Sequence, residues 1–191
     1  MFLELGARVV AVEPQPDCAQ ALRRLGNDSL VVEEIALGTS PGFATIRVAS
    51  ESTISSMSDE WIGRVQRSGR FARYEWLETI PVEVATLDSL IDRHGLPDFC
   101  KIDVEGYERD VVSGLSQPLP MLSFEFAVEY ADGAEAVLTR LEELGFERFN
   151  FAPEETFSFV WDEWRDIHEL RTQLASLPPA ELAWGDVYAA G

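Results

Sequence analysis

The chain has 191 residues, 46% of them hydrophobic, which predicts one compact domain and excludes a disordered tail. The 34 acidic residues against 15 Lys and Arg give a formal charge of −19, which disfavours a nucleic-acid partner because most of the surface would repel phosphates. The sequence contains no run of about 20 apolar residues and no export signal, and its two cysteines form no staple pattern, so we expect a cytoplasmic protein without a membrane partner.

The first half of the chain alternates strand-like and helix-like patterns. In chain order these patterns predict a helix end at residues 2–5, a strand at 8–12, a helix at 17–25, a strand at 30–36, an antiparallel strand at 43–48, a strand at 80–85 and a short helix around 87–91. Residues 49–78 are rich in Ser, Arg and aromatic side chains, with a short helix expected around Trp61. We therefore expect one domain, residues 1–191, in which residues 43–86 form an insertion with a hairpin and a lid.

The second half repeats the alternation more regularly. The patterns predict strands at 98–104, 121–127, 147–151 and 186–189, helices at 107–115, 133–144 and 164–174, and a helix stop at Pro178–Pro179. Alternating strands and amphipathic helices indicate an α/β fold, with parallel strands joined by right-handed crossovers and helices on both faces. Ligands of such sheets gather beyond the carboxyl ends of the strands.

Carboxylates follow three of the predicted strands, at Glu13, at Asp103 with Glu105, and at Glu125. A carboxylate at a strand end can accept two hydrogen bonds from a ribose diol, which makes Glu13 a candidate cofactor ligand. Its position fits equally well a carboxylate that complements the dipole of the next helix. Asp103 and Glu105 could accept a substrate proton, although one of them could instead cap the helix after Gly106.

The carboxylates at the sheet edge could also hold a Mg²⁺-like cation, but we assign no metal, because spacing alone does not define a coordination geometry. The sequence contains no GxGxxG, Walker, GxSxG, CxxC or HExxH pattern, which excludes the common hydrolase and zinc chemistries.

Five motifs in chain order resemble the FkbM family of methyltransferases. They are AVEPQP at residues 11–16, IALG at 35–38, TLDSL at 86–90, KIDVEGYE at 101–108 with Gly114 in the following helix, and FE at 124–125. The resemblance covers most of the chain, and KIDVEG is its most specific part.

The resemblance implies a class I methyltransferase fold, which is Rossmann-like, with a seven-stranded, mostly parallel sheet whose last strand is antiparallel. It also implies S-adenosylmethionine as the methyl donor. Carried over by position, the cofactor-binding residues would be Glu13, Pro14, Ala36, Leu37, Ser55 and Asp103, with Glu13 on the ribose and Ala36 and its neighbours on the adenine. The residues facing the methyl group and the acceptor would be Asp103, Glu105 and Glu125, with Asp103 favoured as the base. Ser55 lies in the STISS loop, which fits an ordinary polar surface loop nearly as well.

The family resemblance favours O-methylation of a hydroxyl on a sugar or small natural product. The sequence lacks the strand and glycine-rich turn with which such domains begin, so we expect either an incomplete sequence or a weakened domain. That gap supports the alternative, a non-catalytic, degenerate methyltransferase fold used for binding. The sequence does not specify an oligomeric state.

Overall fold

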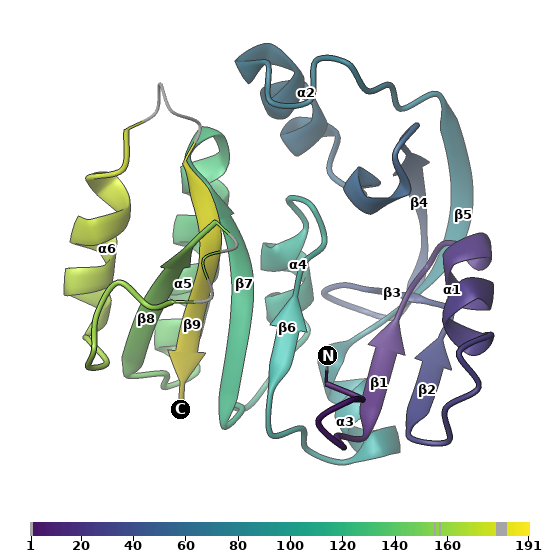
Figure 1. Ribbon diagram of the computed structural model, residues 1–191, viewed down its shortest axis with the longest axis horizontal. Coiled ribbons are helices and arrows are strands. Elements are labelled where there is room, and N and C mark those ends of the chain that lie inside the picture. Colours follow the sequence, from purple (N-terminus) through teal and green to yellow (C-terminus); the bar gives the residue numbers. More distant parts are fainter. Residues whose placement is uncertain (1, 155, 157, 179–182) are drawn as a thin grey trace.

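The computed structural model describes residues 2–154, 156, 158–178 and 183–191 (Figure 1). Strands and helices alternate as the sequence predicted. The elements are β1 (Val9–Val12), α1 (Pro16–Arg23), β2 (Leu30–Glu33), β3 (Ala36–Leu37), β4 (Gly42–Val48), η1 (Ser52–Ile54), α2 (Asp59–Ser68), β5 (Glu78–Ala85), α3 (Leu87–His94), β6 (Cys100–Ile102), α4 (Glu108–Ser113), β7 (Met121–Ala127), η2 (Val128–Tyr130), α5 (Ala131–Glu143), β8 (Arg148–Pro153), α6 (Ile167–Ala175) and β9 (Trp184–Ala190).

The strands form three sheets, with the orders β1-β2, β3-β5-β4 and β6-β7-β9-β8. The predicted α/β class is confirmed, but the prediction of one mostly parallel sheet is wrong. The sheets are mixed, because β4 is antiparallel to β5 and β9 is antiparallel to both β7 and β8. The short turn between β3 and β4 cannot make the long crossover that a parallel neighbour needs, so β4 runs back beside β5. The last strand is antiparallel, as expected.

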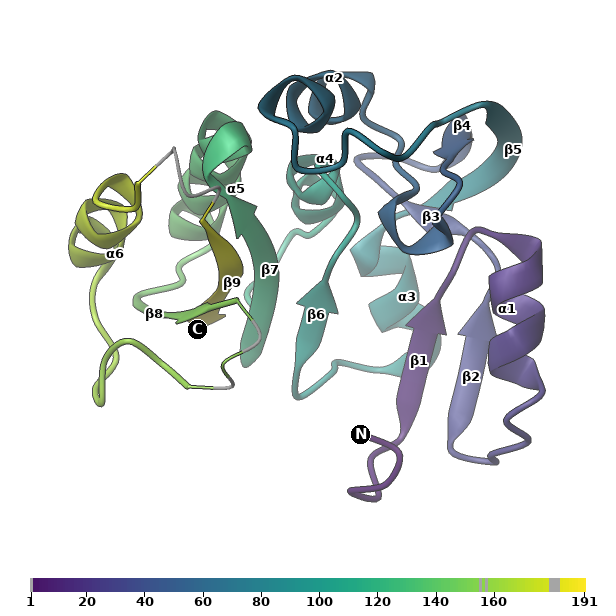
Figure 2. The ribbon, with the colours of Figure 1, turned by 45° about the horizontal axis from the view of Figure 1, so that its top comes forward.

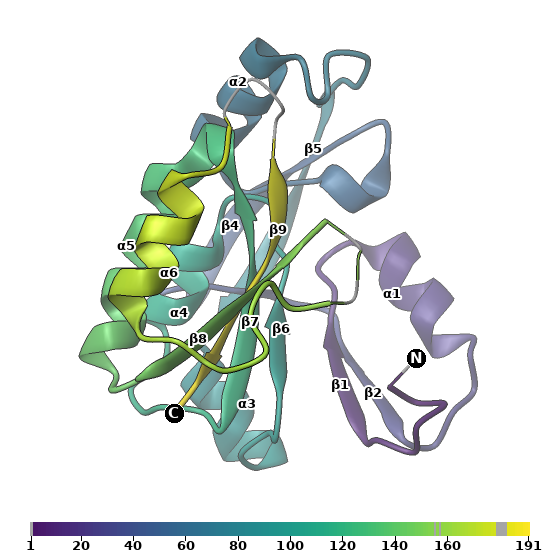
Figure 3. The ribbon, with the colours of Figure 1, turned by 60° about the vertical axis from the view of Figure 1, so that its left-hand side comes forward.

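The main core lies between the four-stranded sheet and the helices on one of its faces. Figure 3 shows α4, α5 and α6 together on one side of this sheet, with α1 beside β2 on the opposite side of the molecule. Alternate residues of β7, namely Leu122, Phe124 and Phe126, are buried against α4 and α5. This period of two is the pattern that identified the strand in the sequence. Among the described helices, none is both long and apolar enough to cross a membrane.

Most predicted elements end within three residues of the observed ones, and three differ more in extent or type. The predicted strand 30–36 is divided, because β2 ends at Glu33 while Ala36 and Leu37 pair with β5 in another sheet. The predicted strand 98–104 is reduced to β6, because the chain turns sharply at Glu105, whose φ is 54°. Residues 2–6 form hydrogen-bonded turns rather than a helix end. Pro179, half of the predicted helix stop, lies outside the described residues.

The inner edges of β1 and β6 border one cavity of about 760 Å³. Figure 2 shows the two strands pointing in the same direction. Within the described part of the chain, β1 pairs only with β2, and β6 pairs only with β7. The cavity therefore lies between the edges of two parallel strand pairs.

The edge of β1 that faces the cavity allows a testable prediction about amide hydrogen exchange. Val9 and Glu13 donate their backbone N–H groups to β2, so the alternation of a strand directs the N–H groups of Val10 and Val12 toward the cavity. We expect Val10 and Val12 to exchange with deuterium faster than Val9 and Ala11, measured by NMR. The paired amides of the same strand are the internal control. Equal protection of all four amides would show that this edge of β1 is covered.

Candidate active site

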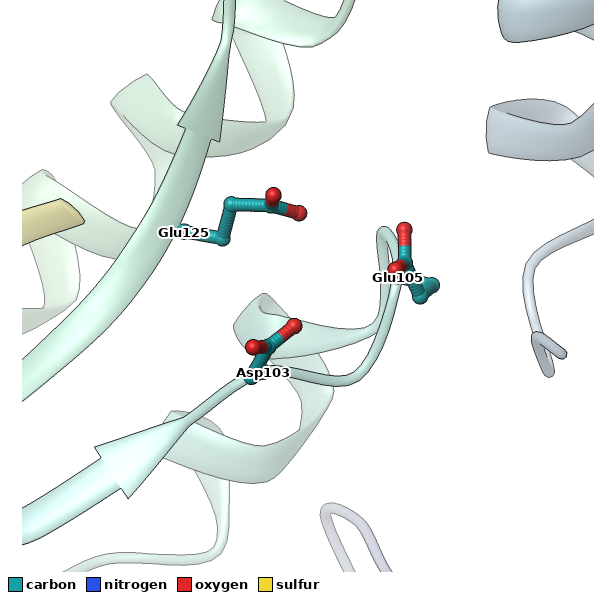
Figure 4. Close-up of side chains that lie close together, drawn as sticks. All are labelled: Asp103, Glu105 and Glu125. Carbon is teal, nitrogen blue, oxygen red and sulfur yellow. The ribbon is translucent and has the colours of Figure 1, made fainter. Parts of the chain in front are cut away.

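Three of the four carboxylates predicted at strand ends meet at one end of the four-stranded sheet, while Glu13 follows β1 of another sheet and is not among them. Parallel pairing places Ile102 of β6 opposite Phe124 of β7, so Asp103 and Glu125 are next to each other in register. Glu105 approaches them from the turn after β6. Carboxylate oxygens of Asp103, Glu105 and Glu125 all lie within 4.8 Å of one another (Figure 4). We call these three residues the carboxylate cluster.

Two members of the carboxylate cluster are removed from water. Burial is the main cause that raises the pKa of Glu105, and the charges of Glu125 and Asp103 raise it further. Burial likewise raises the pKa of Glu125, with the charge of Asp103 as the next cause. Both groups therefore favour the protonated form, because burial and like charge each penalise a carboxylate. Such a cluster can share protons among its members.

Asp103 is the exposed member of the cluster. Its side chain is 44% exposed, and its Oδ2 lies 3.3 Å from Nζ of Lys101. The same ammonium group lies 2.9 Å from Oδ1 of Asp186 on β9. Asp103 is therefore the carboxylate that an incoming molecule can reach and that has a cation beside it.

Glu108, to which the sequence analysis gave no role, lies directly behind the cluster. It begins α4 and is only 5% exposed. Its Oε1 accepts hydrogen bonds from the backbone N–H groups of Val104 and Gly106, at 3.3 and 3.1 Å. Burial raises its pKa to about 7. The sequence carried a signal for it, because position 108 lies on the same buried helical stripe as Val111 and Val112.

All the residues expected to bind a cofactor line the 760 Å³ cavity beside the cluster. They are Glu13, Pro14, Ala36, Leu37, Ser55 and Asp103. They come from segments far apart in the chain, at the ends of β1 and β6, in β3 and after η1. The lining of the cavity mixes apolar side chains with carboxylates, as the lining of small-molecule sites does.

Two of these cavity residues also have structural contacts. Oε1 of Glu13 accepts a hydrogen bond from the N–H of Gln15, the residue that precedes α1, at 2.7 Å. Burial raises the pKa of Glu13. The hydroxyl of Ser55 donates to Oε1 of Gln15 and accepts from the N–H of Ala49, both at 3.1 Å. Glu13 thus supports the start of α1, one of the alternatives that its sequence position allowed, and Ser55 is a buried anchor rather than a loose surface serine.

Helix α2, from the segment 43–86 that we predict to be an insertion, packs beside the carboxylate cluster. Trp61 of α2 packs so close to Gly106 that an added Cβ at Gly106 would lie 2.3 Å from the indole side chain. Ion pairs join α2 and the turn after it to the two elements that follow β7, namely Arg64 to Asp132 of α5 and Arg70 to Glu129 of η2. A cavity of about 10 Å³, room for about one water molecule, remains between Trp61, Glu108, Glu125 and Tyr130.

Residues 2–174 match the family model described as Methyltransferase FkbM domain, which covers most of the chain. No curated protein matches the chain.

The buried Glu108 predicts how stability depends on pH. A carboxyl whose pKa is raised on folding stabilises the fold below its unfolded pKa, and this contribution is lost as pH rises through its folded pKa. We therefore expect the free energy of unfolding to fall between pH 5 and 8. Glu108→Gln should remove part of this fall, up to about 3 kcal/mol, because a pKa unit corresponds to about 1.4 kcal/mol.

Urea unfolding at both pH values measures this effect. Glu147→Gln, at an exposed position, is the control for loss of one carboxylate. If Glu108→Gln and the unchanged chain lose the same stability between pH 5 and 8, the raised pKa of Glu108 is contradicted.

Proposed function

This chain belongs to the FkbM methyltransferase family, and on that premise we propose that it transfers a methyl group from S-adenosylmethionine to a hydroxyl oxygen of a sugar or small natural product. The observation that carries the proposal is the position of the carboxylate cluster at the rim of the large cavity. Asp103 and Glu105 line the cavity itself, so a group held there can meet a proton acceptor.

The residues of the cavity fit the proposed cofactor chemically. Glu13 offers a carboxylate to the ribose hydroxyls, while Ala36 and Leu37 offer apolar surface to the adenine. Within the carboxylate cluster, Asp103 would supply the negative charge for the cationic sulfonium, since Glu105 and Glu125 favour the protonated form. When bound, S-adenosylmethionine supplies an electrophilic methyl group for the acceptor oxygen.

Asp103 is the proposed base. Because Asp103 is exposed, it can reach the acceptor hydroxyl. The ammonium group of Lys101 lies beside it and stabilises its carboxylate. Glu105 and Glu125, whose pKa values burial raises, would hold the acceptor oxygen as hydrogen-bond donors. The carboxylate of Asp103 then accepts the hydroxyl proton as the oxygen gains its methyl group. The main contribution of the protein is to align the two reacting molecules while α2 limits access of water.

Glu13 provides a test of the cofactor site. Glu13→Gln should weaken binding of S-adenosylmethionine about tenfold or more, because hydrogen bonds to a charged acceptor contribute about 1.5–3 kcal/mol. Titration calorimetry with the purified chain measures the affinity. Glu83→Gln on β5 removes one exposed carboxylate and should leave the affinity unchanged. Equal affinities of the Glu13 variant and the unchanged chain would remove Glu13 from the cofactor site.

Asp103 provides a test of catalysis. Asp103→Asn should lower kcat by about 10²- to 10⁴-fold at saturating cofactor, the usual contribution of a general base. Release of S-adenosylhomocysteine in the presence of a panel of sugars and small alcohols measures turnover. Asp92→Asn, an exposed site on α3, is the matched control. Full turnover by the Asp103 variant would exclude it as the base. Cofactor binding by the unchanged chain without turnover on any acceptor would favour the alternative, a non-catalytic binding module.

A further inference from the structure

The turn that carries Glu105 has an uncommon backbone conformation. Glu105 and Gly106 are consecutive left-handed residues, with φ values of 54° and 86°. Gly106 adopts this conformation without strain and lies against Trp61, where a side chain would not fit. A glutamate rarely adopts it, so the surrounding structure must hold Glu105 in place.

Hydrogen bonds hold the turn at each of three consecutive residues. Glu108 accepts from the N–H groups of Val104 and Gly106, at 3.3 and 3.1 Å. Between them, the hydroxyl of Ser56 donates to the carbonyl oxygen of Glu105 at 2.6 Å. The turn is therefore held from both sides, by α4 and by the segment after η1.

Both holding residues are fixed by their own surroundings. Glu108 is 5% exposed and starts a helix whose Val111 and Val112 are almost completely buried. Ser56 is 1% exposed, and its backbone N–H and C=O both pair with Arg47 beside β4, at 3.1 and 2.8 Å. The two residues thus connect the Glu105 turn to two rigid parts of the fold.

We propose that Glu108 and Ser56 are positioning residues, which hold the Glu105 carboxyl against Asp103 and Glu125. The consequence for catalysis rests on the proposed function. A fixed Glu105 keeps a hydrogen-bond donor at the acceptor oxygen, and without the hold its side chain would turn toward water. The charged groups that face Glu105 are Asp103 and Glu108 from its own segment, Glu125 from β7 and Arg70 from the turn after α2.

Two substitutions at position 108 separate hydrogen bonding from charge. Glu108→Gln and Glu108→Ala both remove the carboxylate, and therefore both remove its electrostatic effect on Glu105. Only Glu108→Ala also removes the acceptor for the N–H groups of Val104 and Gly106. A difference between the effects of Glu108→Ala and Glu108→Gln therefore measures how strongly these two hydrogen bonds hold the turn.

The first readout is the titration of Glu105, followed by NMR of its labelled carboxyl carbon. In the unchanged chain the pKa of Glu105 should be well above its ordinary value, because the group is buried among carboxylates. Glu108→Ala should shift the pKa toward the ordinary value as the side chain reaches water, and Ser56→Ala should shift it in the same direction. Glu108→Gln should produce the smaller shift. Equal shifts in Gln and Ala, or none in either Ala variant, would overturn the proposal.

The second readout is turnover. Glu108→Ala should lower kcat on the order of 10- to 100-fold, the size expected when a reacting group is misplaced, with unchanged affinity for S-adenosylmethionine. Glu108→Gln should restore most of the rate. Leu174→Ala on α6 weakens the same core away from α4 and the turn, and it should change neither the titration nor kcat.

The two readouts distinguish the proposal from the function on which it rests. If the predicted titration shifts occur but the unchanged chain transfers no methyl group, the hold on Glu105 stands and the proposed function fails. If turnover occurs and Glu108→Ala keeps both the titration and the rate, the function stands and the positioning role fails. If Glu108→Ala does not fold, Ser56→Ala decides by the same titration, since it leaves α4 intact.

Discussion

The structure depends on keeping three carboxyl groups within 4.8 Å of one another in a place partly removed from water. Ionising all of them there is unfavourable, because burial and mutual repulsion act in the same direction. The nearest cations, Lys101 and Arg70, offset this only in part, since the pKa values of Glu105 and Glu125 remain raised. The three carboxyl groups therefore stay close together because the backbone that carries them is too rigid to let them move apart.

That rigidity originates in the packing of the four-stranded sheet. The pairing of β6 with β7 fixes Asp103 beside Glu125, and the buried side chains of Phe124 and Val111 hold the sheet and α4 together. Glu108 extends this rigid body to the turn through its hydrogen bonds to the backbone. Removing an unpaired carboxylate from water lowers stability, so the packed core supplies the free energy that keeps the site assembled.

The sequence predicted the features that local pattern determines. Strand alternation and helix period identified most elements, and the rule for strand ends selected Glu13, Asp103, Glu105 and Glu125. The roles of Glu108 and Ser56 could not be predicted, because both residues make hydrogen bonds to the turn at Glu105. The left-handed backbone of that turn cannot be inferred from a glutamate in the sequence. The sequence also did not show that the strands divide into separate sheets. An apolar run such as residues 30–36 indicates a strand but does not specify its pairing partner.

The division of the sheets gives the insertion a second role besides packing beside the carboxylate cluster. Glu13 and Ala36 belong to sheets that share no strand pairing with β6 and β7 in the described residues, so backbone ladders do not fix the cavity residues relative to the cluster. The neighbouring serines of the insertion make that connection instead. Ser55 donates to Gln15 beside Glu13, whereas Ser56 donates to Glu105 in the cluster. Two adjacent residues therefore connect the part of the cavity near Glu13 to the carboxylate cluster, and a movement of this segment would change the distance between the two.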